Sequence, residues 1–205
     1  MKRIDCLKAI GSYFNDELVV TNVGGVRHEW YATRPHAGNF HLLNLGLASS
    51  VGLGLALALP HRKVVVFDGD GSLLLNLGSL ATIANQNPSN LIYVVFDNSC
   101  YESSRGAPTA TAGVTDLAVV AKGAGFVHAV TVKKVADFEK EFLTALRSSD
   151  LHFIVAKVEV GVGKVPPAPF EPQENKYAFI RYVEKTENVN ILDSPPPRAY
   201  DMQDK

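Results

Sequence analysis

Two short runs of the sequence are apolar at every position, and they restrict the fold more than any other feature. They are VVVF at 64–67, which follows Lys63, and LIYVVF at 91–96. A strand with one solvent-facing side alternates apolar and polar residues, whereas a strand that is apolar throughout is covered on both faces. Such strands, separated by helices, predict an α/β fold with a doubly wound, mainly parallel sheet and helices on both faces.

The other segments continue this alternation. Further strands are expected at 18–22, 127–132 and 152–158, and helices at 2–14, 45–59, 72–85, 117–125, 134–148 and 177–184. Asp116 is a suitable N-cap for the helix that follows it. Polar and aromatic residues at 26–41, and Ser, Gly, Ala and Thr residues at 99–115, indicate loops.

The chain has 205 residues, enough for one α/β domain with a sizeable core. We assign this domain to residues 1–160. Residues 161–205 differ in character, with prolines clustered in 166–172 and 195–197. They are expected to form an extended arm that contains one helix and packs in an interface with a partner or a second subunit.

Composition excludes several classes of protein. The net charge of −1 argues against the broad basic surface that nucleic-acid-binding proteins have. A phosphate group would therefore have to be bound by a few local groups, such as backbone N–H donors or a metal ion. Cys6 and Cys100 form neither a metal-ligand pattern nor a disulfide framework. The first ten residues lack an apolar signal core, and a reducing cytoplasm is the expected location.

One uncharged run, Leu42 to Leu59, is just long enough to span a membrane. However, it contains Asn44, Ser49 and Ser50, and small residues recur in it every four positions. Such rows let a helix pack very closely against its neighbours, in a membrane or in a protein core. A central buried helix is the better interpretation, and no membrane span is expected.

The candidate site follows two neighbouring strands. Gly69-Asp70-Gly71-Ser72 comes directly after the first apolar run, and Asn98 comes after the second. The start of the next helix offers free N–H groups to a diphosphate, and the glycines allow a close approach. Asp70 would repel a bare diphosphate, but a Mg²⁺ ion between them makes the contact attractive. Asp70, Asn98 and the backbone carbonyl of Cys100 are the proposed metal ligands.

Three other interpretations of this turn stay open. A calcium loop would need a terminal glutamate that is absent. A dinucleotide fingerprint with Asp97 as the ribose-binding acid would need a third glycine, and Asp70 would occupy the pyrophosphate position. An ordinary Asp-Gly turn is the third, but it would not require Asn98 at the neighbouring strand end.

Gly69-Asp70-Gly71, followed after 25 residues by Asp97-Asn98, resembles the thiamine diphosphate signature. In that family the pattern runs from GDG to two asparagines, the second of which is a metal ligand. Here Asp97 stands at the first asparagine and Asn98 at the second. The resemblance implies the thiamine diphosphate-binding fold, with thiamine diphosphate and Mg²⁺ as cofactors.

Other segments extend the resemblance over roughly residues 15–160. Residues 21–24 are similar to a diphosphate-side turn of acetolactate-synthase-like enzymes. Residues 44–46 are similar to the GSMG segment of the same enzymes, where a bulky apolar residue supports the bent form of the cofactor. Leu45 takes that position here. Residues 101–109 resemble the YxSTGGQPT loop of phosphonopyruvate and sulfopyruvate decarboxylases, except at Arg105 and Ala107. The implied cofactor-binding residues are Val23, Gly24, Gly25, Asn44, Leu45, Gly46, Gly69, Asp70, Gly71, Ser72, Asn98, Cys100, Tyr101 and Glu102.

The resemblance also implies an activity. Thiamine diphosphate enzymes need a glutamate from a pyrimidine-binding domain, for which this chain has no spare length. No catalytic residue is assigned here, because the activating Glu is expected from a partner chain. The chain is therefore interpreted as the diphosphate-binding subunit of a 2-oxo acid decarboxylase, a carboxy-lyase of phosphonopyruvate or sulfopyruvate type. It would be inactive alone, and would assemble with a pyrimidine-binding subunit as a homodimer or heterotetramer.

Alternatives remain for the activity and for single residues. The departures at Arg105 and Ala107 are also compatible with a non-catalytic or regulatory thiamine diphosphate-binding module, and an acetolactate-synthase-like carboligase subunit is another alternative. A ferredoxin oxidoreductase subunit is disfavoured because cluster cysteines are absent. Arg105 either binds an anionic substrate group or is a solvated loop charge. The loop contains His28, His36 and His41. Either one of these histidines transfers protons to or from the substrate, or all three only make polar packing contacts.

Overall fold

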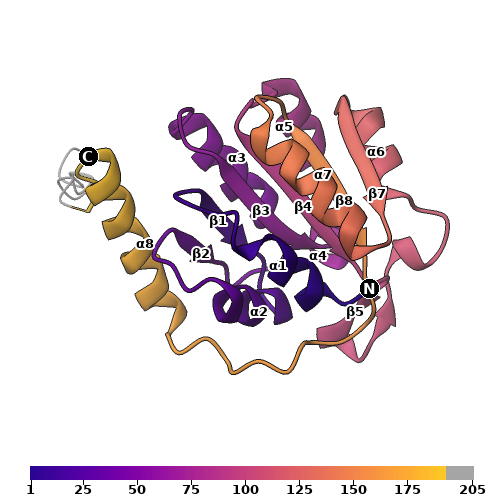
Figure 1. Cartoon of the computed structure of the whole chain (residues 1–205). Coiled ribbons are helices and arrows are strands. Elements are labelled where there is room, and N and C mark those ends of the chain that lie inside the picture. Colours follow the sequence, from indigo (N-terminus) through magenta and orange to yellow (C-terminus); the bar gives the residue numbers. More distant parts are fainter. Residues whose placement is uncertain (193–205) are drawn as a thin grey trace, which may run out of the picture.

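Six parallel strands form the central sheet, in the order β2-β1-β3-β4-β8-β7 (Figure 1). The computed structural model describes residues 1–192. Its sheet strands are β1 (Leu18–Thr21), β2 (Asn39–His41), β3 (Val64–Gly69), β4 (Leu91–Asp97), β7 (His128–Val132) and β8 (His152–Lys157). Every residue of β4 is buried, as are the first five residues of β3 and of β8. The predicted doubly wound parallel sheet is confirmed.

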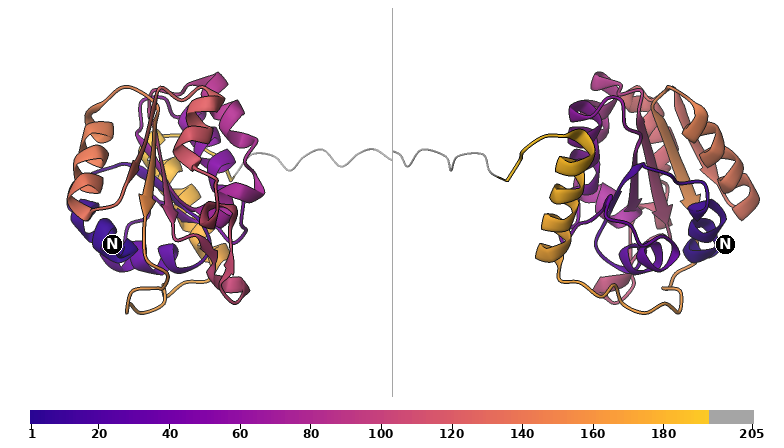
Figure 2. Two further views of the ribbon diagram at one scale, coloured as in Figure 1. Left: turned by 90° about the vertical axis from the view of Figure 1, so that its right-hand side faces the viewer. Right: turned by 60° about the vertical axis from the view of Figure 1, so that its left-hand side comes forward.

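Helices cover both faces of this sheet, and Figure 2 shows the sheet edge-on between the two layers. One layer consists of α1 (Arg3–Gly11), α2 (Gly25–Thr33) and α7 (Val135–Arg147). The other consists of α3 (Ala48–Ala58), α4 (Asp70–Leu75), α5 (Ser79–Gln86) and α6 (Leu117–Ala124). Asp116 caps α6 as predicted, because its side chain accepts hydrogen bonds from the N–H groups of Ala118 and Val119.

The small residues of α3 explain its close approach to the sheet. A Cβ at Gly52 would overlap the side chain of Val66 on β3. Substitution would therefore push the helix away from the strand. This is the role in a protein core that the four-residue spacing indicates. Within residues 1–192, no helix has the length and apolar character needed to cross a membrane.

The prediction of a loop at 26–41 is wrong, because this segment contains α2 and β2. Its polar side chains misled the prediction, since several of them pair inside the protein. Glu29 is fully buried and forms an ion pair with Arg3. Trp30 is also fully buried and donates through Nε1 to Oδ1 of Asn39 at 3.0 Å. Buried polar groups need such partners, and here the partners come from distant parts of the sequence.

Two further segments differ from the prediction. The helix expected at 72–85 is divided into α4 and α5. Between them, Asn76 leaves the helical conformation and donates through Nδ2 to the carbonyl oxygen of Gly46 at 2.8 Å. The loop at 99–115 contains an antiparallel pair of short strands, β5 (Cys100–Tyr101) and β6 (Ala107–Pro108), and the short 3-10 helices η1 (Glu102–Ser104) and η2 (Ala110–Ala112).

The described part of the arm packs on its own chain. After a long linker, α8 (Pro172–Glu187) lies beside β2 at the edge of the sheet (Figure 1). Phe179 and Val183 are buried in the core. Asn175 bonds the edge strand, since its Oδ1 accepts from the N–H of His41 and its Nδ2 donates to the carbonyl oxygen of Asn39. Residues 193–205, with their three prolines, lie outside the described residues, and a subunit interface on the arm stays a prediction.

Candidate diphosphate and metal site

The candidate site lies where the chain reverses its direction across the sheet. From β1 the chain goes outward to β2, whereas from β3 it goes to β4 on the other side. Ligands of parallel α/β proteins bind at such a switch point, outside the carboxyl ends of the strands. The residues after β1, at 22–26, and those at the end of β3 and after it, at 68–72, line one pocket here.

Most of the predicted cofactor-binding residues line this pocket. They are Val23, Gly24, Gly25, Leu45, Gly69, Asp70, Gly71, Ser72, Asn98, Cys100, Tyr101 and Glu102. Two others, Asn44 and Gly46, lie beside it without lining it. Asn44 is exposed, and the N–H of buried Gly46 donates to Oγ of Ser72 at 2.9 Å. The sequence analysis missed Arg3, Asn22, Val26, Asp68 and Phe96, which complete the lining.

Asp70 lies at the first position of α4 and is only 2% exposed. Its Oδ2 accepts hydrogen bonds from Oγ1 of Thr109 at 2.6 Å and from Oγ1 of Thr111 at 3.1 Å. Burial raises the pKa of Asp70, while the bond from Thr109 acts in the opposite direction. A buried carboxylate held in this way is stabilised by a cation, which is the role that the sequence predicts for Mg²⁺.

Asn98 and Cys100 form a tight turn beside Asp70. The N–H of Cys100 donates to Oδ1 of Asn98 at 3.1 Å, and Ser99 between them has a left-handed φ of 61°. A non-glycine residue in this conformation marks a turn that its surroundings hold in place. Asp70, Asn98 and Cys100 all line the pocket. A carboxylate, an amide oxygen and a backbone carbonyl are hard oxygen donors of the kind that fits Mg²⁺.

Asn22, at the end of β1, provides independent evidence that this pocket receives a ligand. The residue is 6% exposed, and its Oδ1 is buried without a hydrogen-bond partner among the described residues. An unpaired buried acceptor is costly, and a bound ligand or water relieves that cost. Because Asn22 lines the same pocket as Asp70, the residues fit a polar group bound between them.

A buried arginine contributes hydrogen-bond donors to the pocket. Arg3 is 7% exposed, and its Nε lies 2.6 Å from Oε2 of Glu29, which balances its charge. A Cβ at Gly25 would overlap the guanidinium of Arg3, so the absence of a side chain there lets the guanidinium approach the start of α2. Free N–H groups at a helix start favour binding of an anion such as a diphosphate, and the guanidinium of Arg3 lies beside them.

The glycines of the turn also permit close packing. A Cβ at Gly71 would lie 2.5 Å from the ring of Tyr101. The ring of Tyr101 therefore packs directly on the backbone of the glycine-aspartate turn. The loop that begins at β5 and the turn after β3 form one continuous wall of the pocket.

Residues 23–156 match the model of a family described as "Thiamine pyrophosphate enzyme, C-terminal TPP binding domain". The matched span contains the turn after β3, the Asn98 turn and the loop at 99–115 that follows it. The chain belongs to this family. The resemblance drawn from Gly69-Asp70-Gly71 and Asn98 is thereby confirmed.

Relatives in this thiamine pyrophosphate family include separate subunits and longer single chains. Sulfopyruvate decarboxylase subunit beta of Methanocaldococcus jannaschii is 41% identical over 187 residues, which cover 90% of this chain and 98% of that one. Phosphonopyruvate decarboxylase of Streptomyces viridochromogenes is 36% identical over 172 residues, which cover 80% of this chain and 42% of the relative.

A solved structure has the same fold. Benzoylformate decarboxylase from Polynucleobacter necessarius superimposes with a TM-score of 0.62 at 19% identity, over 82% of this chain and 34% of the other. At this level of identity the likeness concerns the arrangement of strands and helices alone. It agrees with the sheet order and helix layers described above.

The family's first asparagine is replaced by Asp97, and the structure shows what supports the change. Asp97 is 1% exposed, and its Oδ2 accepts a 2.5 Å hydrogen bond from Nζ of Lys157 on the neighbouring strand β8. Its Oδ1 accepts from Oγ1 of Thr111 at 2.8 Å and from the N–H of Ser99 at 3.0 Å. The additional negative charge is therefore paired inside the protein.

The histidines at 26–41 do not line the pocket of this thiamine pyrophosphate domain, and all three have packing contacts elsewhere. His28 and His36 each accept a backbone N–H through Nδ1, from Ala168 and Gly38 respectively. Nδ1 of His41 lies 2.8 Å from Oγ1 of Thr21. These contacts support the polar-packing alternative.

Cys100 lines the pocket, but its thiol is not activated. Burial, followed by the nearby carboxylate of Glu102, raises the pKa of Cys100. A thiol needs a lowered pKa to act as a nucleophile at neutral pH. The backbone carbonyl of Cys100 therefore remains the group assigned to the site.

Proposed function

We propose that this chain is the diphosphate- and Mg²⁺-binding subunit of a thiamine diphosphate-dependent decarboxylase. Its substrate would be a small 2-oxo acid of the sulfopyruvate or phosphonopyruvate type. The observation that carries the proposal is the convergence of Asp70, Asn98 and Cys100 on one pocket at the switch point. Relatives of nearly the same length named as decarboxylase beta subunits support the choice of reaction.

Thiamine diphosphate supplies a nucleophilic carbon and an electron sink for the loss of CO₂ from a 2-oxo acid. The task of this chain is to hold the charged end of the cofactor. Asp70, Asn98 and the carbonyl of Cys100 would bind Mg²⁺. The N–H groups that begin α2, together with Arg3, would neutralise the diphosphate, and Leu45 would support the thiazolium side.

Glu102, which lines this pocket, and Glu29, which is paired with Arg3 beside it, accept other hydrogen bonds, and this supports the proposal that a partner provides the activating glutamate. Glu29 forms the ion pair with Arg3, and its Oε1 accepts the N–H of Gly163. Oε1 of Glu102 accepts the N–H of Gly161. Neither carboxylate is available to activate the aminopyrimidine ring. We therefore propose that a pyrimidine-binding subunit provides the activating glutamate.

Exposed leucines indicate where such a subunit would bind. Leu43, Leu45, Leu47, Leu57 and Leu75 are each at least 41% exposed. Leu45 lines the pocket, and the others belong to its own loop, to α3 and to the end of α4. Clusters of exposed apolar residues are characteristic of protein interfaces. A partner over this surface would enclose the cofactor. The assembly would be a homodimer or, with separate pyrimidine-binding subunits, a heterotetramer, in the cytoplasm.

The test is reconstitution. The chain would be purified alone and together with a pyrimidine-binding chain from the same organism, and CO₂ release would be measured from sulfopyruvate, phosphonopyruvate and pyruvate. We expect turnover only from the assembled pair, with thiamine diphosphate and Mg²⁺ present. Robust decarboxylation by the single chain would refute the divided site, and light scattering of the pair would give its stoichiometry.

A second candidate function is a non-catalytic cofactor-binding module, because Arg105 and Ala107 replace the Gly and Gln of the related loop. An assembled pair that binds thiamine diphosphate but releases no CO₂ from any of the three acids would favour it. A carboligase subunit would instead convert pyruvate to acetolactate, which product analysis detects.

A further inference from the structure

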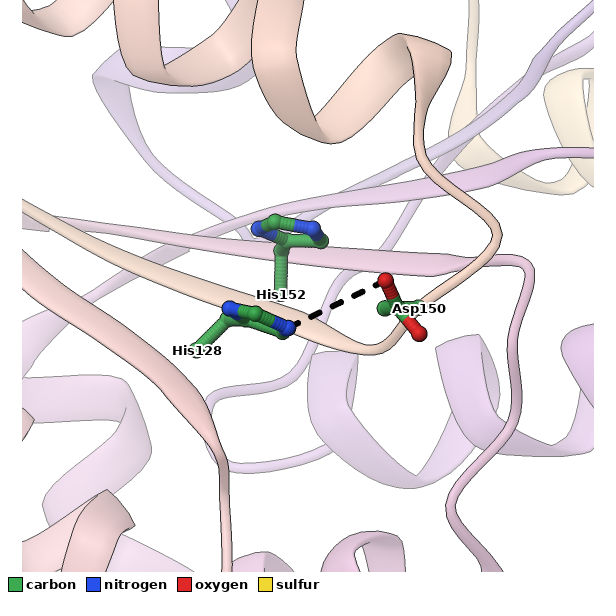
Figure 3. A group of neighbouring side chains, drawn as sticks. All are labelled: His128, Asp150 and His152. Atoms are coloured by element: carbon green, nitrogen blue, oxygen red, sulfur yellow. Dashed lines mark ion pairs between the residues drawn. The ribbon is translucent and has the colours of Figure 1, made fainter.

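A group of side chains of the types that bind metals lies at the amino ends of β7 and β8, whereas the cofactor pocket lies at the carboxyl ends of the strands. His128 and His152 are the first residues of β7 and β8 and are paired in register. Their rings are stacked, with centroids 4.6 Å apart and planes 13° from parallel. Asp150 stands beside them, with its Oδ2 3.8 Å from Nε2 of His128 (Figure 3).

One of these imidazoles lacks a partner that it needs. His152 is 8% exposed, and its Nε2 is buried without a hydrogen bond among the described residues. A buried ring nitrogen in this state is costly unless a ligand binds it. The neutral imidazole, with a free lone pair on one ring nitrogen, is the form in which histidine binds metals.

We propose that His128, Asp150 and His152 bind one first-row transition ion of the Zn²⁺ type. One ligand atom from each residue lies within 4.8 Å of the others. Zn–N distances near 2.0–2.1 Å in a tetrahedral site require nitrogens about 3.3 Å apart. Because the two rings are stacked nearly parallel, their in-plane lone pairs do not yet converge on one point. His128 and Asp150 are both exposed, so the ring of His128 can turn out of the stack and the carboxylate can follow it to complete the site. The fourth position is left for water or for a group from a partner.

The ligand types determine which ion the site prefers. Two imidazoles and one carboxylate suit Zn²⁺, Ni²⁺ or Cu²⁺, whereas Mg²⁺ prefers an all-oxygen set such as that near Asp70. The two sites therefore discriminate between ions, and the binding of Zn²⁺ here does not depend on the proposed decarboxylase function. A bound ion would connect β7, β8 and the turn at 148–151.

Two neighbouring residues adjust the site. Oγ of Ser148 donates to Oδ2 of Asp150 at 2.8 Å, which orients the carboxylate as outer contacts do in metal sites. Lys63 acts against the ion, because its Nζ is held at the carbonyl oxygen of Ser148, two residues before Asp150, and its positive charge repels a cation there. Replacing Lys63 with methionine should therefore strengthen Zn²⁺ binding.

The experiment is calorimetric titration of ZnCl₂ into the tag-free full chain, alone and with its partner, after chelator treatment. We expect one high-affinity ion per chain, a higher midpoint of thermal unfolding, and no displacement by excess MgCl₂. His128→Ala and Asp150→Asn should weaken binding at least tenfold. Both positions are exposed, so these variants are expected to fold.

The matched control is His61→Ala. His61 is an exposed histidine beside a carboxylate, 2.6 Å from Oε2 of Glu187, but no second imidazole is near enough to form such a group within residues 1–192. This variant should bind Zn²⁺ like the parent chain, as should Asp70→Ala. No Zn²⁺ binding, or equal binding by the His128→Ala variant, would overturn the proposal without affecting the proposed function.

Discussion

The hydroxyl group of Thr109 donates a 2.6 Å hydrogen bond to Oδ2 of Asp70, which lies 39 residues earlier in the chain. Thr111 extends the contact, since its Oγ1 lies within hydrogen-bond distance of both Asp70 and Asp97. The loop after β4 and the turn after β3 therefore share one hydrogen-bond network. The position of the candidate metal ligand Asp70 therefore depends on residues outside the Gly69-Asp70-Gly71 turn that contains it.

Removal of the Thr109 hydroxyl tests this network. Thr109→Val preserves shape but deprives Asp70 of a strong charge-assisted donor, so we expect Mg²⁺-dependent cofactor affinity to fall about tenfold, or about 1.4 kcal/mol. Calorimetry on the assembled pair measures it. Thr144→Val is the control, because that hydroxyl donates to the carbonyl oxygen of Lys140 on the exposed side of α7. Equal affinities for both variants would show that the bond to Asp70 is unimportant.

The buried charge of Asp97 depends on Lys157. Lys157→Met should lower the free energy of unfolding by about 2 kcal/mol, because it leaves a buried carboxylate without its cation. This predicted loss of free energy is smaller than the loss from breaking a fully buried ion pair, because Lys157 is 32% exposed. The double variant with Asp97→Asn should recover most of the loss, as measured by urea denaturation. A double variant no more stable than the Lys157→Met variant would contradict the pairing.

Arg105 occupies a backbone conformation suited to glycine, with φ 58°. Arg105→Gly removes this strain but raises the conformational entropy of the unfolded chain. Because the two effects oppose each other, we expect the free energy of unfolding to change by less than about 0.5 kcal/mol. Arg105→Val should cost more than about 1 kcal/mol, since a β-branched residue tolerates this region poorly. Urea denaturation compares the two. If Arg105 also binds the substrate's anionic group, KM should rise in both variants while cofactor affinity is unchanged.

Burial lowers the pKa of His41 to about 3, from an ordinary value of 6.5. Between these values the unfolded chain binds the proton and the folded chain does not, so the free energy of unfolding falls as pH falls below about 6.5. The slope from this residue approaches about 1.4 kcal/mol per pH unit. His41→Phe should flatten the stability profile between pH 7 and 4.5, measured by denaturation at each pH. The exposed-site variant His61→Phe should retain the steeper profile.

The sequence was informative where a local pattern and the chain topology coincide. The runs at 64–67 and 91–96 are apolar throughout, so they predicted buried neighbouring strands. Parallel pairing then brings Asp70 and Asn98, which follow those strands, to the same sheet edge. These two residues could be assigned because the fold itself makes them neighbours.

Other features depend on contacts that local patterns do not reveal. Arg3 and Glu29 appear as ordinary surface charges until α1 and α2 pack together and bury their ion pair. That pair is also why the polar segment at 26–41 was mistaken for a loop. The stacking of His128 on His152 depends on the register of β7 with β8, and neither histidine was singled out by its sequence surroundings.

The most direct test of the account is calorimetric titration of thiamine diphosphate into the assembled pair, with Mg²⁺ and with chelator, for the parent chain and for Asp70→Ala. We predict that chelator abolishes binding to the parent and that the variant does not bind detectably in either condition. Unchanged affinity in the Asp70→Ala variant with Mg²⁺ present would contradict the assignment of this turn to the metal-diphosphate site.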